Sequence, residues 1–255
     1  MRLLDKIIPG RAEKRRQRKF HVVEFDKIAR YHDDRRTGDP FFALYREALS
    51  ASTSNDNILK QNRFFTLYQA AQQLLQTGVQ GDFAECGCFK GHSTYMLAKM
   101  LKQQGGARHF WVFDSFEGGL SDKVEKDRSQ HGNTDVVATV EQKLKYASSY
   151  EQVQQVLAPF DFVKLEKGWI PQVFDRPGLA DRKFALVHVD VDLYEPVRDS
   201  LEFFLPRMAP GGLIVLDDYG SAVFPGAKIA TDEVLAKHKV RLFLQTHLQG
   251  AIIVV

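Results

Sequence analysis

Short apolar runs alternate with stretches of helical periodicity from residue 81 almost to the end of this chain. The runs have strand length and are rich in β-branched and aromatic residues, whereas the stretches between them repeat apolar residues every three or four positions. Strands are predicted over residues 82–86, 109–113, 162–165, 184–189 and 213–216, and helices over 93–104, about 197–208 and 227–238. Strands joined through helices run parallel by right-handed crossovers, so the pattern predicts an α/β fold with a mostly parallel sheet.

Two further apolar runs close the chain, at residues 241–247 and 251–255. They are joined by only a few residues around Gly250, which is enough for a hairpin but too short for a parallel crossover. The sheet should therefore contain one antiparallel strand at its C-terminal end.

The N-terminal third has a different pattern. Residues 40–49 and 57–76 carry apolar stripes at helical spacing, and we expect residues 41–78 to be a helical cover for the sheet domain of residues 79–255. Such helices often pack on another subunit, so a homo-oligomer is expected. Residues 1–40 form a tail with a dense basic run. Two interpretations stay open for this tail: a solvated segment, or weak contact with an anionic membrane surface or a partner.

Composition narrows the class of protein. The 255 residues are 44% apolar, which is ample for the core of one large α/β domain, and the net charge of +3 gives no reason to expect nucleic acid. No apolar stretch approaches the length of a transmembrane helix. Cys86 and Cys88 lie two apart in one predicted strand, where their side chains would point to opposite faces and could not easily pair. We therefore expect a reduced, cytoplasmic protein.

Acidic residues follow two of the predicted strands. The strand at 184–189 ends in Asp190 and Asp192, and the strand at 213–216 ends in Asp217 and Asp218. The carboxyl ends of parallel strands lie on the same edge of a sheet, so Asp190, Asp217 and Asp218 should converge. Three carboxylates repel one another unless a cation lies between them, and oxygen ligands suit Mg²⁺. The alternative is that these acids merely cap the loops or helices that follow.

A glycine-containing turn follows the first strand, in the sequence ECGCFKGHST of residues 85–94. Gly87 and Gly91 would let the backbone approach a bound molecule, and the helix that starts near Ser93 would direct free amide groups at it. The second strand ends at Asp114, where an acid can accept hydrogen bonds from ribose hydroxyls. The pattern predicts a nucleoside-type site at the point where the strand order reverses, although tight turns use glycine without any ligand.

Five motifs together resemble the macrocin-type (TylF-like) O-methyltransferases: ECGCFKG, VFDSFEG, EKGWIPQVF, VDVDLYEP and LDDYG. The resemblance covers residues 57–255 and implies the Rossmann-like sheet of the class I methyltransferases, with S-adenosyl-L-methionine as cofactor. The implied cofactor contacts are Glu85, Gly87, Gly91 and Ser93 near the methionine end, Asp114 and Ser115 near the ribose, and Gly168 and Trp169 near the adenine. The implied metal ligands are Asp190, Asp217 and Asp218. His92 departs from the family, which often has a second glycine there.

These parts fit O-methylation. A cation on a hydroxyl oxygen lowers its pKa and fixes its direction, so a nearby base need take only a partly acidic proton. Asp190 is one candidate base, and His131 in the polar stretch SQHGNTD is another, unless it is an ordinary exposed loop histidine. His188 lies inside a strand and is expected to be a core residue.

The insertion at about residues 116–160 is longer than an ordinary crossover, and we expect it to cover the site, with a helix over residues 136–157 beside the N-terminal helices. Its polar first part favours a small-molecule acceptor with a sugar or glycoside hydroxyl over a catechol or other phenol. Two rival classes stay open: a nicotinamide-dependent oxidoreductase, which would not need the later aspartates, and a binding module that keeps the fold without the reaction.

Overall fold

The computed structural model describes residues 40–255 except 106, 118, 129–144 and 247–248. The chain divides into two units, residues 1–43 and 44–255. Of the first unit the description covers only residues 40–43, which begin helix α2 (Pro40–Ser52), so the basic tail lies outside the described residues. In the part of the chain that is described, no helix is both long and apolar enough to cross a membrane.

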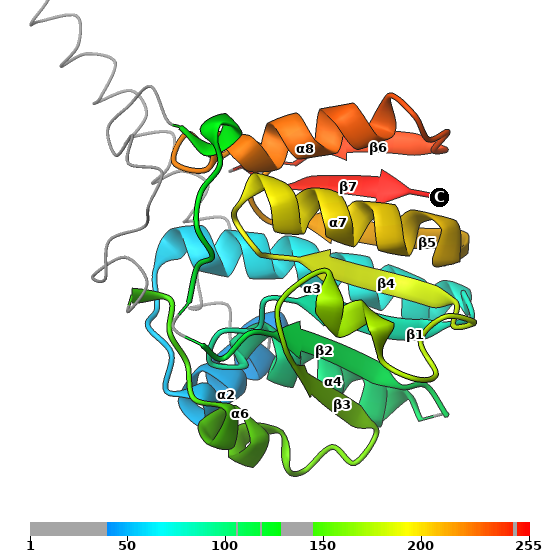
Figure 1. Cartoon of the computed structure of the whole chain (residues 1–255). Helices are drawn as coiled ribbons and strands as arrows, with labels where there is room; N and C mark the ends of the chain where they lie inside the picture. Colours follow the sequence, from blue (N-terminus) through cyan, green and yellow to red (C-terminus); the bar gives the residue numbers. More distant parts are fainter. Residues whose placement is uncertain (1–39, 106, 118, 129–144, 247–248) are drawn as a thin grey trace, which may run out of the picture. The chain divides into compact units, whose positions relative to one another are not determined.

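The second unit contains the predicted sheet. Its seven strands have the order β3-β2-β1-β4-β5-β7-β6, and only β7 runs antiparallel to its neighbours (Figure 1). The strands are β1 (Asp82–Cys86), β2 (Phe110–Asp114), β3 (Val163–Lys167), β4 (Phe184–Val189), β5 (Met208–Leu216), β6 (Leu242–Gln245) and β7 (Ala251–Val254). The predicted α/β class, the mostly parallel sheet and the antiparallel C-terminal strand are therefore confirmed.

Helices lie on both faces of the sheet. Helices α3 and α4 cover one face, and α7 and α8 pack side by side on the other (Figure 1). The α-helices of this unit after α2 are α3 (Ile58–Thr77), α4 (His92–Gln104), α6 (Tyr150–Leu157), α7 (Tyr194–Phe204) and α8 (Pro225–Leu235). Short 3₁₀ turns are η2 (Glu125–Asp127), η3 (Gln172–Asp175) and η4 (Leu205–Arg207). Covered on both faces, β4 is buried at every position, which explains its continuous apolar sequence.

Several boundaries differ from the sequence prediction, among them that of α7, which was expected over about 197–208 and spans 194–204. Strand β5 begins at Met208 and not at Leu213, because its pairing with β4 shifts register and lets the segment around Pro210 belong to the strand. Helix α8 spans residues 225–235, two residues earlier than expected at its start and three at its end. Proline is well tolerated in the first turn of a helix, where its missing N–H has no partner to lose, so Pro225 is a natural start.

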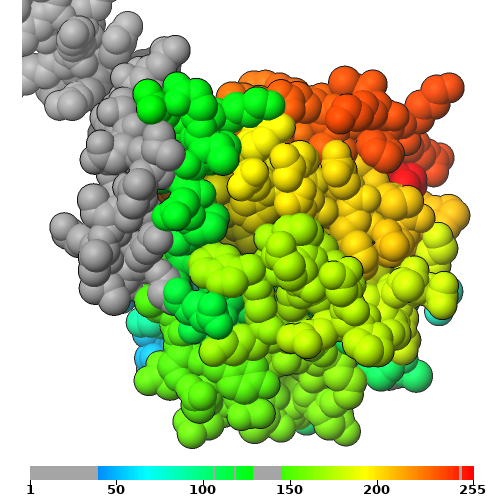
Figure 2. All heavy atoms as spheres, in the orientation of Figure 1, coloured from blue at the N-terminus to red at the C-terminus, as the bar shows by residue number. Residues whose placement is uncertain are grey.

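The insertion is only partly as predicted. Residues 129–144 lie outside the described residues, and in the remainder the expected helix is confined to α6, residues 150–157. This helix packs mainly against α4 and β3. The earlier part of the insertion lies elsewhere: η2 packs against α8, and the space-filling view shows this segment in green beside α7 and α8 (Figure 2).

Candidate functional site

A cavity of about 530 Å³ opens at the carboxyl ends of the parallel strands. It lies where the strand order reverses, between β1 and β4, which is the position that the sequence predicted. Of the predicted site residues, Gly87, Ser93, Asp114, Ser115, Gly168, Trp169, Asp190 and Asp218 line it. Glu85, Gly91 and Asp217 are not among the described residues that line it. His131 lies outside the described residues.

The turn after β1 is held close to the end of β4. A side chain on Gly87 would collide with the backbone oxygen of Asp190, and the φ of Gly87 is 82°, in the left-handed region that favours glycine. Glycine is therefore required here because the backbone of Asp190 lies close to Gly87, and not because of a close approach to a bound molecule. Gly91 caps α4 with a φ of 80°, and a side chain there would meet only Val153 and Val156 of α6, at ordinary contact distances of 3.5 and 3.7 Å.

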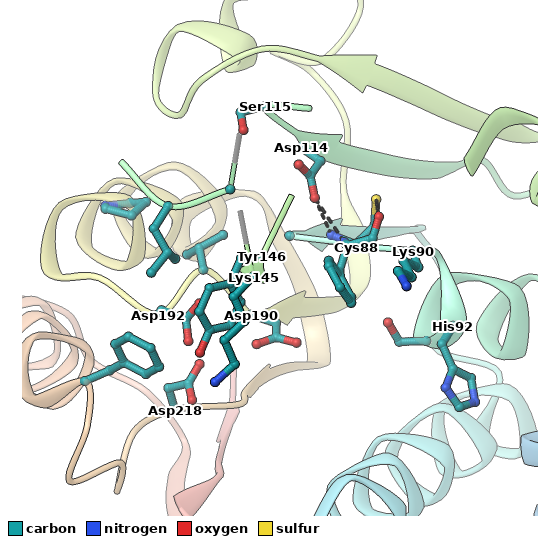
Figure 3. A pocket seen from close by; sticks show the side chains of 18 of the residues that line it. Cys88, Lys90, His92, Asp114, Ser115, Lys145, Tyr146, Asp190, Asp192 and Asp218 are labelled. Atoms are coloured by element: carbon teal, nitrogen blue, oxygen red, sulfur yellow. Dashed lines mark hydrogen bonds between the residues drawn. The ribbon is translucent and has the colours of Figure 1, made fainter. Parts of the chain in front are cut away.

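Asp114 fixes the same turn from the side of β2. Its Oδ2 accepts hydrogen bonds from the backbone amides of Cys88 at 2.9 Å and Phe89 at 3.1 Å (Figure 3). Its Oδ1 accepts one from the backbone amide of Phe116 at 3.1 Å. Burial raises the pKa of Asp114, and the three amide hydrogen bonds oppose that shift. The carboxylate is thus oriented before any ligand arrives. Further along this wall, Trp169 donates from Nε1 to Oε2 of Glu117 at 2.9 Å.

Glu85 lies below the cavity and not on its surface. It is fully buried, accepts a short hydrogen bond from the Thr94 hydroxyl, and contacts Nδ1 of His188 at 2.8 Å. His188 is 1% exposed, which confirms it as a core residue, and its Nδ1 is hydrogen-bonded to Glu85. Glu85 therefore ties β1 to α4 and β4 beneath the site.

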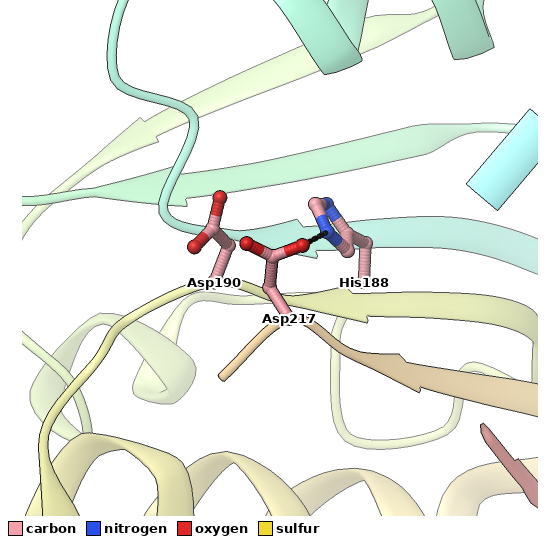
Figure 4. Close-up of side chains that lie close together, drawn as sticks. All are labelled: His188, Asp190 and Asp217. Atoms are coloured by element: carbon pink, nitrogen blue, oxygen red, sulfur yellow. Dashed lines mark ion pairs between the residues drawn. The ribbon is translucent and has the colours of Figure 1, made fainter. Parts of the chain in front are cut away.

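The three predicted metal ligands do not form one group. Asp190 joins Asp192 and Asp218 in one cluster, in which one oxygen from each residue lies within 4.8 Å of the others. Asp190 also belongs to a second cluster with His188 and Asp217 (Figure 4). Asp217 and Asp218 follow the end of β5 at Leu216, and their side chains belong to different clusters.

Asp217 has partners of its own. Its Oδ1 lies 3.9 Å from Nε2 of His188 (Figure 4), and its Oδ2 forms an ion pair with Arg63 of α3. An arginine already supplies the positive charge that a metal would bring to Asp217. The second cluster is therefore the poorer cation site.

The cluster of Asp190, Asp192 and Asp218, by contrast, fits a hard cation. All three line the cavity, they offer only oxygen donors, and the buried Oδ2 of Asp218 has no hydrogen-bond partner. Burial and the neighbouring carboxylates raise the pKa of Asp192 to about 7 and that of Asp218 well above its usual value, while Arg63 opposes both shifts. A divalent cation would relieve this repulsion.

Sequence reasoning left out several side chains of this site. Asp192 was noted at the strand end but not counted as a ligand; its φ of 58° is a left-handed conformation that aspartate tolerates better than most residues. Tyr146 lines the cavity beside the acids, and the carboxylates reinforce burial in raising its pKa to about 12. Lys60 and Arg63 reach the cavity from α3. Their positions at the polar edge of the apolar stripe are the only sequence signal that could have placed them in the site.

Comparison with known proteins places the chain in a family. The family model described as macrocin-O-methyltransferase (TylF) matches residues 8–247. The chain belongs to this family. Membership confirms the resemblance drawn from the five motifs and argues against the nicotinamide-dependent oxidoreductase that the sequence left open.

Individual proteins of known activity or structure share limited sequence identity with this chain. The chain is similar to the 8-demethyl-8-(2,3-dimethoxy-alpha-L-rhamnosyl)-tetracenomycin-C 4'-O-methyltransferase of Streptomyces olivaceus, with 32% identity over 62% of this chain and 60% of that protein's length. Among solved structures, the O-methyltransferase NovP superposes with a TM-score of 0.65 at 23% identity over 79% of this chain and 82% of that one. An O-methyltransferase from Bacillus cereus in complex with SAH superposes with a TM-score of 0.54 at 17% identity over 90% of this chain and 97% of that one. These two structures support the fold.

Proposed function

We propose that this protein is an S-adenosyl-L-methionine-dependent, Mg²⁺-dependent O-methyltransferase whose acceptor is a hydroxyl of a sugar or of a glycosylated small molecule. The observation that carries the proposal is that one cavity joins Asp114 at one end to the cluster of Asp190, Asp192 and Asp218 at the other. A nucleoside subsite next to an oxygen-lined cation site is what methyl transfer to a poorly acidic hydroxyl requires.

The cofactor would lie across the turn after β1. Asp114 would accept hydrogen bonds from the ribose hydroxyls, and Gly168 and Trp169 would contact the adenine. Gly87 and Ser93 would line the methionine end, with Gly91 and the buried Glu85 supporting the turn from outside the cavity. This orientation would direct the methyl group towards Asp190, which follows the neighbouring strand β4.

Asp190, Asp192 and Asp218 would hold the Mg²⁺ ion, which would lower the pKa of an acceptor hydroxyl bound beside it. Asp190, the base proposed from the sequence, lines the cavity, and so does Asp192. Asp192 lies in the same cluster as Asp190, so we add it as a candidate base. Leu120, Leu193 and Phe224 form a small buried apolar cluster that would limit the access of water to these carboxylates.

A phenolic acceptor remains the second candidate, because the cavity is more aromatic than its polar insertion indicated. The aromatic residues that line it are Phe64, Phe89, Phe113, Tyr146, Trp169 and Phe224. Most of them come from outside the insertion, so the polarity of the insertion did not indicate the aromatic content of the cavity. The sugar acceptor is supported instead by the relative from Streptomyces olivaceus, whose name describes a methyl transfer to a rhamnosyl group.

The test is a methyl-transfer screen on the full chain with S-adenosyl-L-methionine, using sugars, glycosides and catechols with Mg²⁺ and with EDTA. We expect turnover of a sugar or glycoside that EDTA abolishes and added Mg²⁺ restores. Turnover confined to catechols would overturn the sugar assignment, and full activity in thoroughly chelated enzyme would overturn the metal. Binding of the cofactor without any methyl transfer would support the non-catalytic module.

A further inference from the structure

Basic side chains line the same cavity as the acids. Lys60 and Arg63 come from α3, Lys90 comes from the turn between β1 and α4, and Lys145 precedes Tyr146. Arg63 is committed to Asp217. Among the described residues none of the three lysines forms an ion pair: the side chain of Lys60 donates to the backbone oxygen of Asn55 at 3.0 Å and lies over the Phe64 ring, and Lys90 and Lys145 lie over the rings of Phe89 and Tyr146.

The lining of the cavity carries nearly balanced charges. Among the described residues three lysines face four carboxylates, those of Asp114, Asp190, Asp192 and Asp218, because Arg63 is already paired with Asp217. His92 adds no charge, because burial lowers its pKa to about 3. The proposed Mg²⁺ brings two positive charges, and S-adenosyl-L-methionine, with a sulfonium, an ammonium and a carboxylate, brings a net one. With Mg²⁺ and the cofactor bound, positive charge would exceed negative charge in the cavity, and a neutral acceptor would not offset it. Charges in a partly buried cavity are poorly screened.

Lys60, at the start of α3, is the lysine of the lining with the most neighbouring charges. Lys60 lies in the first turn of that helix, half-buried, and Ser54, Asn55 and Asn57 beside it also line the cavity. The pKa of Lys60 is lowered to about 8, mainly by burial and also by the charges of Arg63 and Lys90, while the carboxylates of Asp56 and Asp190 oppose the shift. Lys60 and Lys90 are therefore near enough to repel each other. Hydroxyl and amide groups next to two such cations can complete the hydrogen bonds of an oxyanion.

Resting on the proposed methyl transfer, we propose that Lys60 and Lys90 form an anion subsite that binds a phosphate group on the sugar acceptor. The natural acceptor is then a phosphorylated or nucleotide-linked sugar, methylated before the sugar is transferred to its final position. The same lysines could in principle pair with the carboxylate of the cofactor. Because both ligands present ionised oxygens, the experiment must separate the two sources.

The first measurement compares acceptors. Each sugar in the screen is offered as its methyl glycoside and as its 1-phosphate, and kcat/KM is measured for wild type, Lys60→Gln, Lys90→Gln and the control Lys239→Gln, an exposed lysine outside the cavity. We expect wild type to prefer the phosphate at least about tenfold, the range of a hydrogen bond to a charged group. Lys60→Gln and Lys90→Gln should each lose about tenfold on the phosphate and less than about twofold on the glycoside. Lys239→Gln should behave as wild type.

The second measurement is independent of turnover. Inorganic phosphate is titrated calorimetrically into the full chain loaded with SAH and without Mg²⁺, so that no metal can bridge the anion to the carboxylates. We expect the affinity for phosphate to fall about tenfold in Lys60→Gln and in Lys90→Gln, with the affinity for SAH unchanged in both.

Several results would overturn the anion subsite. Equal or better turnover of the glycoside by wild type would do so, as would equal losses on both acceptors in the lysine variants. A loss of SAH affinity with phosphate binding unchanged would assign the lysines to the cofactor carboxylate. If no acceptor is methylated in any form, the proposed function fails, and the phosphate titration still decides the subsite.

Discussion

Asp114 has two roles at the scale of a single residue. It orients the turn after β1 through the amides of Cys88 and Phe89, and it is the proposed acceptor for the ribose hydroxyls. Replacing Asp114 with alanine removes both, so we expect the affinity for SAH to fall by about 1.5 to 3 kcal/mol, the range for hydrogen bonds to a charged group. Calorimetric titration of SAH measures the change. An unchanged affinity would remove Asp114 from the cofactor site.

His92 should make the folded state sensitive to acid. It is 3% exposed, its Nε2 donates to the backbone oxygen of Tyr45 at 3.1 Å, and burial lowers its pKa to about 3. Between about pH 6.5 and pH 3, His92 is protonated in the unfolded chain and neutral in the native state. The contribution of His92 to the free energy of unfolding is therefore present above about pH 6.5 and falls as the pH drops, by up to about 1.4 kcal/mol per pH unit.

The check on His92 is urea unfolding at several pH values. The free energy of unfolding of His92→Gln should decline less steeply with acid than that of wild type between about pH 6.5 and pH 4.5. His238→Gln, a change in a less buried histidine outside the cavity, serves as the control and should keep the wild-type slope. The same slope in His92→Gln as in wild type would contradict the assignment.

Single residues also mark the limit of the sequence prediction. The acids after β4 and β5 could be placed at one edge of the sheet because apolar runs end there. The directions of their side chains could not, because Asp217 and Asp218 lie in the bend after β5, where no strand alternation sets the direction of a side chain. Only the structure shows that Arg63 forms an ion pair with Asp217, while Asp192 and Asp218 lie in one cluster of carboxylates. The position of Lys60 in the cavity could not be predicted either, since a lysine at the polar edge of an amphipathic helix is usually an ordinary surface residue.

At the scale of the element, the turn between β1 and α4 is the most constrained part of the site. Alanine at Gly87 would collide with the backbone oxygen of Asp190 and would also need a φ of 82°. Alanine at Gly105, after α4, would need a similar φ of 72° but would have nothing within 4 Å. The two substitutions therefore share backbone strain and differ in the collision.

We expect Gly105→Ala to reduce the free energy of unfolding by about 1 to 3 kcal/mol, from the strain of its glycine-favouring backbone conformation alone. Gly87→Ala should lose a further 1 to 3 kcal/mol or so, because overpacking forces the backbone apart, and it should also weaken SAH binding. Denaturant unfolding and calorimetry on both variants supply the comparison. Equal losses in the two variants would mean that the turn can move away from β4 freely.

Elements were predicted well where periodicity and burial agree. Strand β4 is buried on both faces, so its continuous apolar run gave its bounds to the residue. Strand β5 was predicted five residues too short at its start because Pro210, Gly211 and Gly212 read as a turn, whereas a shift of register against β4 accommodates them within the strand. The insertion was the least predictable element, since its described parts pack on different helices and its sequence carries no continuous stripe.

At the scale of the whole molecule, the proposed cofactor and cation share one cavity in the folded state, so each should stabilise the protein. A ligand at about one hundred times its dissociation constant adds about 2.7 kcal/mol, which corresponds to a rise in Tm of several degrees for a chain of this size. Thermal unfolding is measured with SAH, with Mg²⁺, with both and with neither, and each shift is taken relative to the same variant without ligand.

Asp218→Asn and Asp217→Asn then form a matched pair, because the two aspartates are adjacent in sequence and differ in direction. Asp218 lines the cavity with Asp190 and Asp192, so Asp218→Asn should lose the Mg²⁺ shift and keep the SAH shift. Asp217 is paired with Arg63, so Asp217→Asn should lower the starting Tm by leaving that half-buried arginine without its partner, yet keep most of the Mg²⁺ shift in Tm. Loss of the Mg²⁺ shift in both variants would instead restore the three ligands implied by the family resemblance, and it would require Arg63 to move away when the ion binds.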